Sequence, residues 1–212
     1  MEYTKGIVYH LALDGCPSIC YTRNMKNAII LHGLPSKKEY YNEKSPSCSN
    51  SHWFPWLQKH LMIHDIKADT PEVPNAYDPK WELFVKEVER FDISSETTLV
   101  GHSMGGGFWV RYLSEHPEIF VDKVILVAPW LNLSHEENIA FFDFEINPTI
   151  VEHTNKFIVF ASDNDHKEVQ DSVTFLRERI PTATFRMFHN YEHFTIKSMK
   201  TDAFPELLEA IL

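Results

Sequence analysis

Cysteine, basic charge and long apolar runs are all scarce in this chain, and each shortage excludes a class of protein. Its 212 residues include only three cysteines, an odd number that is too small for a disulfide framework. The low cysteine content favours a reducing compartment. The formal net charge is -10 and Lys and Arg are not clustered, so we expect no nucleic-acid partner. Residues 1–15 lack a secretion-signal pattern, and no segment is long enough to span a bilayer. We therefore expect a cytoplasmic protein without a membrane partner.

Patterns that hold phosphates, metals or cofactors are equally scarce. The chain has seven glycines, and the run Gly105 to Gly107 follows a serine motif instead of forming a phosphate loop. His60 and His64 have the four-residue spacing of helical metal ligands but no third ligand. Cys16 and Cys20 form a lone C-x-x-x-C pair. We expect no metal and no cofactor, and we interpret these histidines as surface residues.

The chain does contain short apolar runs that alternate with helical patterns, which is typical of a parallel sheet. The six runs are Ala28–Leu31, Ile66–Ala68, Thr98–Val100, Val124–Val127, Phe157–Phe160 and Thr184–Phe188. We predict a three-layer α/β fold: a six-stranded parallel sheet with helices on both faces, in one domain over residues 26–212. Residues 1–25 lie outside this pattern and are expected to form an N-terminal β-hairpin extension.

Local signals place several helices and loops between the strands. Asp78 and Pro79 have the residue types of an N-cap and a first helical position, so we expect a helix to open there. Pro205 should open a C-terminal helix in the same way. Residues 36–51 are polar and irregular, and we expect a long functional loop directly after the first core strand.

The most specific motif is Gly101-His102-Ser103-Met104-Gly105, which matches G-x-S-x-G between a buried strand and a helical pattern. This spacing predicts a nucleophile elbow, in which a strained turn exposes the serine and only small residues fit beside it. We predict Ser103 as the nucleophile. The N–H of Met104, at the start of the following helix, is expected to stabilise an oxyanion.

A serine nucleophile needs a histidine base and a carboxylate that orients the base, in the chain order Ser, Asp/Glu, His. His193, in a loop after the sixth strand, is the best base, and His189 is its nearest rival. Asp163 and Asp165 both follow the fifth strand, and spacing alone leaves the choice between them open.

Two further histidines flank the expected site. His102 should point away from the serine into the sheet packing, in a structural role. His32 and Gly33 follow the first strand and have the pattern of an oxyanion-hole loop, whose second N–H donor should be Leu34.

Together these residues resemble the α/β-hydrolases, and more narrowly the small serine hydrolases related to retinoblastoma-binding protein nine. The resemblance spans roughly residues 26–212 and is carried by Asn27–Gly33, Ser51–Leu57, Asp78–Trp81, Gly101–Ser103, Ala161–Asp165 and Glu192–Phe194. In that family the second aspartate of the acid turn belongs to the triad, which implies Asp165. The resemblance also implies the strand order 2-1-3-4-5-6 of flavodoxin-like sheets. The chain departs from the family at Glu192, where Gly is usual, and after Leu34, where a glycine-rich run is usual.

From these features we expect a serine hydrolase that cleaves small acyl esters through a Ser103, His193, Asp165 triad and an acyl-enzyme. A peptidase or a thioesterase would use the same residues. An alternative of another class is a protein-binding module with weak activity, for which the N-terminal hairpin would offer an edge strand. Residues 129–156 are too short for a large lid, and Trp130, Phe141 and Phe142 are either pocket walls or core.

Overall fold

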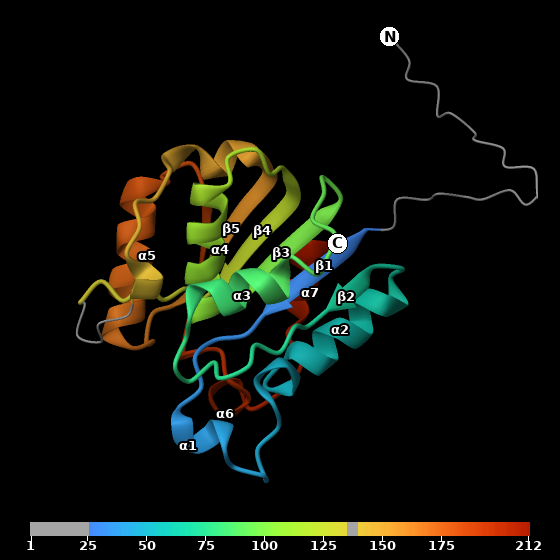
Figure 1. Cartoon of the computed structure of the whole chain (residues 1–212). Coiled ribbons are helices and arrows are strands. Elements are labelled where there is room, and N and C mark those ends of the chain that lie inside the picture. Colours follow the sequence, from blue (N-terminus) through green and yellow to red (C-terminus); the bar gives the residue numbers. More distant parts are fainter. Residues whose placement is uncertain (1–25, 135–139) are drawn as a thin grey trace, which may run out of the picture.

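A six-stranded sheet, entirely parallel, forms the centre of the computed structural model, which describes residues 26–134 and 140–212 (Figure 1). Its strand order is β2-β1-β3-β4-β5-β6, which confirms the predicted order. The strands are β1 (Asn27–Leu31), β2 (Lys67–Asp69), β3 (Thr97–His102), β4 (Val121–Val127), β5 (Thr154–Ser162) and β6 (Thr184–Phe188). The expected N-terminal hairpin and the Cys16, Cys20 pair lie outside the described residues.

Register in the sheet brings the functional loops together. Leu31 at the end of β1 is paired with Gly101 of β3, and His102 is paired with Val127 at the end of β4. The strand order reverses between β1 and β3, and in open α/β sheets a crevice forms at that point, outside the carboxyl ends of the strands. The loop after β1 and the turn after β3 therefore face one another across this crevice.

Helices cover both faces of the sheet, as predicted (Figure 1). They are α1 (Lys37–Tyr40), α2 (Phe54–Ile63), α3 (Trp81–Val88), α4 (Met104–Glu115), α5 (Lys167–Arg179), α6 (Ile196–Met199) and α7 (Pro205–Ile211). Alternate residues of β1 point to opposite faces: Ile29 joins the core beneath α3 and α4, and Ile30 joins the core beneath α2 and α7. Among the described residues, no helix combines the length and the apolar character needed to cross a membrane.

Two local predictions are wrong: the start of one helix and the irregular structure of one loop. Asp78 does not cap a helix; it forms an ion pair with Lys80 at 3.1 Å, and α3 begins at Trp81 with no side-chain cap. The segment 36–51 is not irregular throughout, because it contains α1 and the short 3-10 helix η1 (Cys48–Asn50). Ser36 and Glu39 close a capping box at α1, with the Ser36 backbone N–H 3.0 Å from the Glu39 carboxylate.

Two of the three aromatic residues left open as pocket wall or core belong to the core. Phe141 and Phe142, in the 3-10 helix η2 (Ala140–Phe142), are buried in the cluster beneath α3 and α4, and Trp130 is packed against it. Arg111 of α4 donates to the carbonyl oxygen of Phe141 at 2.8 Å. A further 3-10 helix, η3 (Pro148–His153), leads into β5.

Candidate active site

Ser103 lies on a strained turn between β3 and α4. Its φ of 54° and ψ of -120° place a non-glycine residue in a rarely populated region of backbone space. The turn is fixed on both sides, because the Ser103 N–H donates to the carbonyl oxygen of Val127 at 2.9 Å and its own carbonyl oxygen accepts from Trp130 at 3.1 Å. Met104 is the first residue of α4, so its N–H precedes the helical hydrogen-bond ladder.

Close backbone approaches explain why glycines surround this serine. A Cβ atom added at Gly101 would lie 2.4 Å from the carbonyl oxygen of Gly105, and one added at Gly105 would lie 2.4 Å from that of Leu31. At Gly33, after β1, an added Cβ would lie 2.8 Å from the Cβ of Ser103. The loop after β1 is therefore packed directly against the serine, as a second oxyanion donor requires.

The half-buried His193 and the buried Asp165 form a pair beside the cleft that Ser103 lines. Nδ1 of His193 lies 2.9 Å from Oδ1 and 3.1 Å from Oδ2 of Asp165, whose side chain is 1% exposed. A carboxylate only accepts, so Nδ1 carries a proton, and the neutral tautomer that makes this bond has its lone pair on Nε2. The N–H of His166 also donates to Oδ1 of Asp165, at 2.7 Å.

A second Asp–His pair lies nearby and involves the two rivals. Nδ1 of His189 is 2.6 Å from Oδ2 of Asp163, and their side chains are 80% and 43% exposed. The hydrogen bond from His189, with one from the backbone N–H of Asn190, lowers the pKa of Asp163. The geometry thus separates the alternatives: Asp165 contacts the histidine of the cleft, and Asp163 contacts a histidine at the surface.

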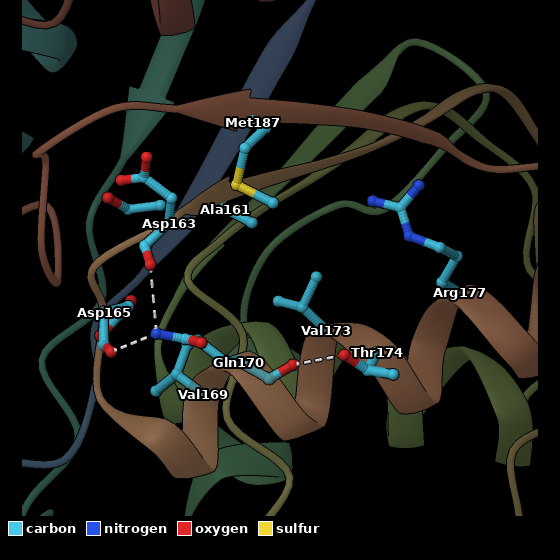
Figure 2. A pocket seen from close by; sticks show the side chains of 10 residues that line it. Ala161, Asp163, Asp165, Val169, Gln170, Val173, Thr174, Arg177 and Met187 are labelled. Carbon is cyan, nitrogen blue, oxygen red and sulfur yellow. Dashed lines mark hydrogen bonds between the residues drawn. The ribbon is translucent and has the colours of Figure 1, made fainter.

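The turn after β5 also binds the backbone of the loop that carries His193. Oγ of Ser162 accepts from the Tyr191 N–H at 3.1 Å, and Oδ1 of Asn164 accepts from the Glu192 N–H at 2.9 Å. Figure 2 shows the Gln170 amide of α5 directed at this turn, where it donates to the carbonyl oxygen of Asp165 at 2.7 Å. The sequence did not indicate the roles of Ser162 and Asn164, because their partners lie 29 and 28 residues away along the chain.

A cleft of about 1060 Å³ opens beside Ser103. Ser103, His193 and Leu34 all line it, together with four more histidines, His32, His52, His102 and His166. Residues of the segment 36–51, which was expected to form a functional loop, make up much of its wall. A smaller cavity of about 170 Å³, shown in Figure 2, lies between α5 and the turn after β5 and contains neither Ser103 nor His193.

His32 fixes the conformation of the loop after β1. Its Nδ1 donates to the carbonyl oxygen of Gly33 at 2.8 Å, and its Nε2 accepts from the Val73 N–H at 3.1 Å. This arrangement uses the neutral imidazole, in agreement with the burial that lowers the pKa of His32. The neutral His32 thus holds the loop against Ser103 at Gly33 without adding a positive charge to the cleft wall.

Charge in the cleft lining is of one sign. Glu39, Glu43 and Glu72 line it, and no Lys or Arg does so among the described residues. Burial, the largest single effect, acts to raise the pKa of Glu72, but hydrogen bonds from Ser49 and the smaller effects of His32 and Ser47 together lower it. Burial, followed by the charge of Glu72, raises the pKa of Cys48 to about 12, so this thiol stays protonated and unreactive.

The histidine spacing that resembled a metal site has another explanation. The ring of His60 is stacked on Trp56 with centroids 4.0 Å apart, and its Nδ1 bonds the Trp56 carbonyl oxygen at 2.8 Å. Within residues 26–134 and 140–212, no group of three or more His, Cys, Asp and Glu side chains is arranged to hold a metal ion.

Comparison with known proteins identifies the family of this chain. Residues 43–201 match the family described as serine hydrolase. The chain belongs to that family. YdeN of Bacillus subtilis (strain 168) is 27% identical over 174 residues, which cover 77% of this chain and 84% of YdeN.

Solved structures show the same fold. The crystal structure of the ydeN gene product from B. subtilis has a TM-score of 0.71 at 21% identity, covering 88% of this chain and 96% of that one. Est1E from Butyrivibrio proteoclasticus, solved with ferulic acid bound, has a TM-score of 0.55 at 12% identity, covering 87% and 86%. The serine hydrolase described here therefore has the α/β-hydrolase fold.

Proposed function

We propose that this serine hydrolase cleaves small acyl esters with Ser103 as nucleophile, His193 as general base and Asp165 as the carboxylate that orients the base. The observation that carries the proposal is the contact of the buried Asp165 with His193 at the cleft that the strained Ser103 turn lines. The Nδ1–H donated to Asp165 leaves Nε2 of His193 free to take the serine proton.

In the first half of the reaction, Oγ of Ser103 forms a bond to the acyl carbon while His193 Nε2 accepts the hydroxyl proton. The carbonyl electron pair moves onto oxygen, and the N–H groups of Met104 and Leu34 stabilise this oxyanion. When the oxyanion collapses, the ester C–O bond breaks, and His193 returns the proton to the leaving alkoxide.

In the second half, water attacks the acyl-enzyme and transfers a proton to His193. The acid is released and the proton returns to Ser103. No step requires a metal or an organic cofactor.

The acidic residues of the cleft lining restrict which acyl groups the enzyme should accept. The carboxylates of Glu39, Glu43 and Glu72 in a partly desolvated cleft repel an anionic substrate, and no Lys or Arg among the described lining residues offsets them. We therefore expect the substrates to be esters whose acyl group carries no negative charge. Amides and thioesters present the same carbonyl to the same groups, and parallel assays against them rank the three bond types.

The test compares the steady-state hydrolysis of p-nitrophenyl esters of increasing chain length by wild type, Ser103→Ala and Ser114→Ala. Ser114 is the matched control: its Oγ donates to the Val110 carbonyl oxygen within α4, away from the cleft. We expect Ser103→Ala to lose all but about one part in 10⁶ of kcat while Ser114→Ala retains it. Hydrolysis by Ser103→Ala at the wild-type rate would refute the assignment.

A further inference from the structure

His102 connects the serine turn to the loop of the base. It is the last residue of β3, directly before Ser103, and its ring is buried at 4% exposure. Nε2 of His102 lies 2.9 Å from the backbone carbonyl oxygen of His193, ninety-one residues later in the chain. Two consecutive residues of the elbow therefore serve the site in different ways: Ser103 faces the cleft, and His102 bonds the main chain of the histidine.

We propose that His102 is a positioning residue, whose Nε2–H fixes the turn that presents the His193 imidazole to Ser103. A carbonyl oxygen only accepts, so the hydrogen must lie on Nε2 of His102. The inference extends the structural role expected for this residue to a specific action on the catalytic base, and it rests on the proposed function.

The turn at His193 needs such a contact, because its neighbours have an unfavourable backbone. Glu192 and Phe194, on either side of His193, have φ values of 45° and 52°, which non-glycine residues rarely adopt. Such conformations persist only where surrounding contacts over-determine them. The carbonyl oxygens of His193 and Phe194 provide two such contacts, since His102 binds the first and Trp53 Nε1 binds the second at 3.1 Å.

The surroundings of His102 keep it in the required form. Its ring lies among the aromatic rings of Trp53 and Phe54, with centroids 5.8 and 6.3 Å away, and the His193 ring lies 5.0 Å away. Burial, followed by the charges of His193 and His52, holds the pKa of His102 well below its usual range. Burial thus favours the neutral imidazole of His102, in which Nε2 carries the one N–H proton.

The experiment compares His102→Leu, which removes the donor at similar size, with His102→Gln, whose amide nitrogen replaces Nε2. Thr97→Val is the matched control in the same strand: it removes a buried hydroxyl that donates to Asn27 at 2.8 Å, far from the cleft. We expect His102→Leu to lower kcat by about 10-fold to 100-fold, because a small misplacement of a catalytic group costs that much. KM should change by less than about 2-fold, and His102→Gln should recover most of kcat.

Proton NMR of the imidazoles gives a readout that does not depend on turnover. The Nδ1 proton of His193, which is held by Asp165, should give a low-field resonance in wild type and in His102→Gln. In His102→Leu this resonance should be lost, because the proton exchanges with water. Equal kcat for His102→Leu and wild type, or an equal loss of kcat in Thr97→Val, would overturn the proposal. If wild type hydrolyses no ester, the proposed function fails, and the NMR comparison alone decides the role of His102.

Discussion

Replacing Asp165 by Asn separates a carboxylate that orients the base from one that only supports a turn. The Asp165 side chain is 1% exposed and both of its oxygens contact His193 Nδ1. When the imidazole becomes positively charged, a charge pair about 4 Å apart at an effective dielectric constant of about 20 is worth about 4 kcal/mol. That energy corresponds to a factor of about 10³ in rate.

An asparagine at position 165 has a second effect, because its amide can donate to Nδ1 and stabilise the wrong tautomer of His193. With both effects together, we expect kcat to fall by about 10⁴-fold, the size known for loss of an orienting carboxylate in a serine protease. The assay is steady-state hydrolysis of a p-nitrophenyl ester, with urea unfolding to verify that the variant is folded.

The matched control is Asp163→Asn, because Asp163 lies two residues away and pairs with the exposed His189. An exposed pair of this kind contributes little, so kcat should change by less than about 3-fold. The reasoning is refuted if Asp163→Asn loses as much activity as Asp165→Asn, or if Asp165→Asn stays within tenfold of wild type.

Two further predictions concern stability. Gly105→Ala places a Cβ 2.4 Å from the Leu31 carbonyl oxygen, so we expect it to lower the free energy of unfolding, measured with urea, by about 1–3 kcal/mol. Gly106→Ala is the control and should lower it less, because the nearest contact of its Cβ would be Pro129 Cβ at 3.0 Å. Glu72 has a lowered pKa in the folded chain, so it adds stability above its unfolded pKa and loses it as pH falls through the folded value. Glu72→Gln should therefore lower the urea midpoint at neutral pH and flatten its decline in acid; an unchanged acid slope would contradict this.

The sheet could be predicted from the sequence because its central strands are short, continuous apolar runs, a pattern typical of buried parallel strands. The elbow could be predicted because Gly101 and Gly105, where no larger side chain fits, are only two residues from Ser103 in the sequence. Helix starts were harder to predict. Asp78 and Pro79 have the residue types of a helix start, yet Asp78 pairs with Lys80. Conversely, Ser36 and Glu39 cap a helix in a segment that was predicted to be irregular.

The arrangement of the site depends on contacts between distant segments. Asp163 and Asp165 are two residues apart, and His189 and His193 are four apart, so the sequence alone allows more than one pairing. The structure selects the pairs because backbone contacts fix how the turn after β5 meets the loop after β6, as in the bond from the Glu192 N–H to Asn164. The bond from His102 to His193 is invisible in the sequence for the same reason.

The most direct test of the account is to label the protein with a fluorophosphonate probe and locate the adduct by mass spectrometry of its peptides. The proposed chemistry predicts one covalent adduct, on Ser103, which forms rapidly in wild type and far more slowly in Asp165→Asn. An adduct on any other residue, or no adduct on the folded protein, would contradict the claim that Ser103 is the nucleophile of this hydrolase.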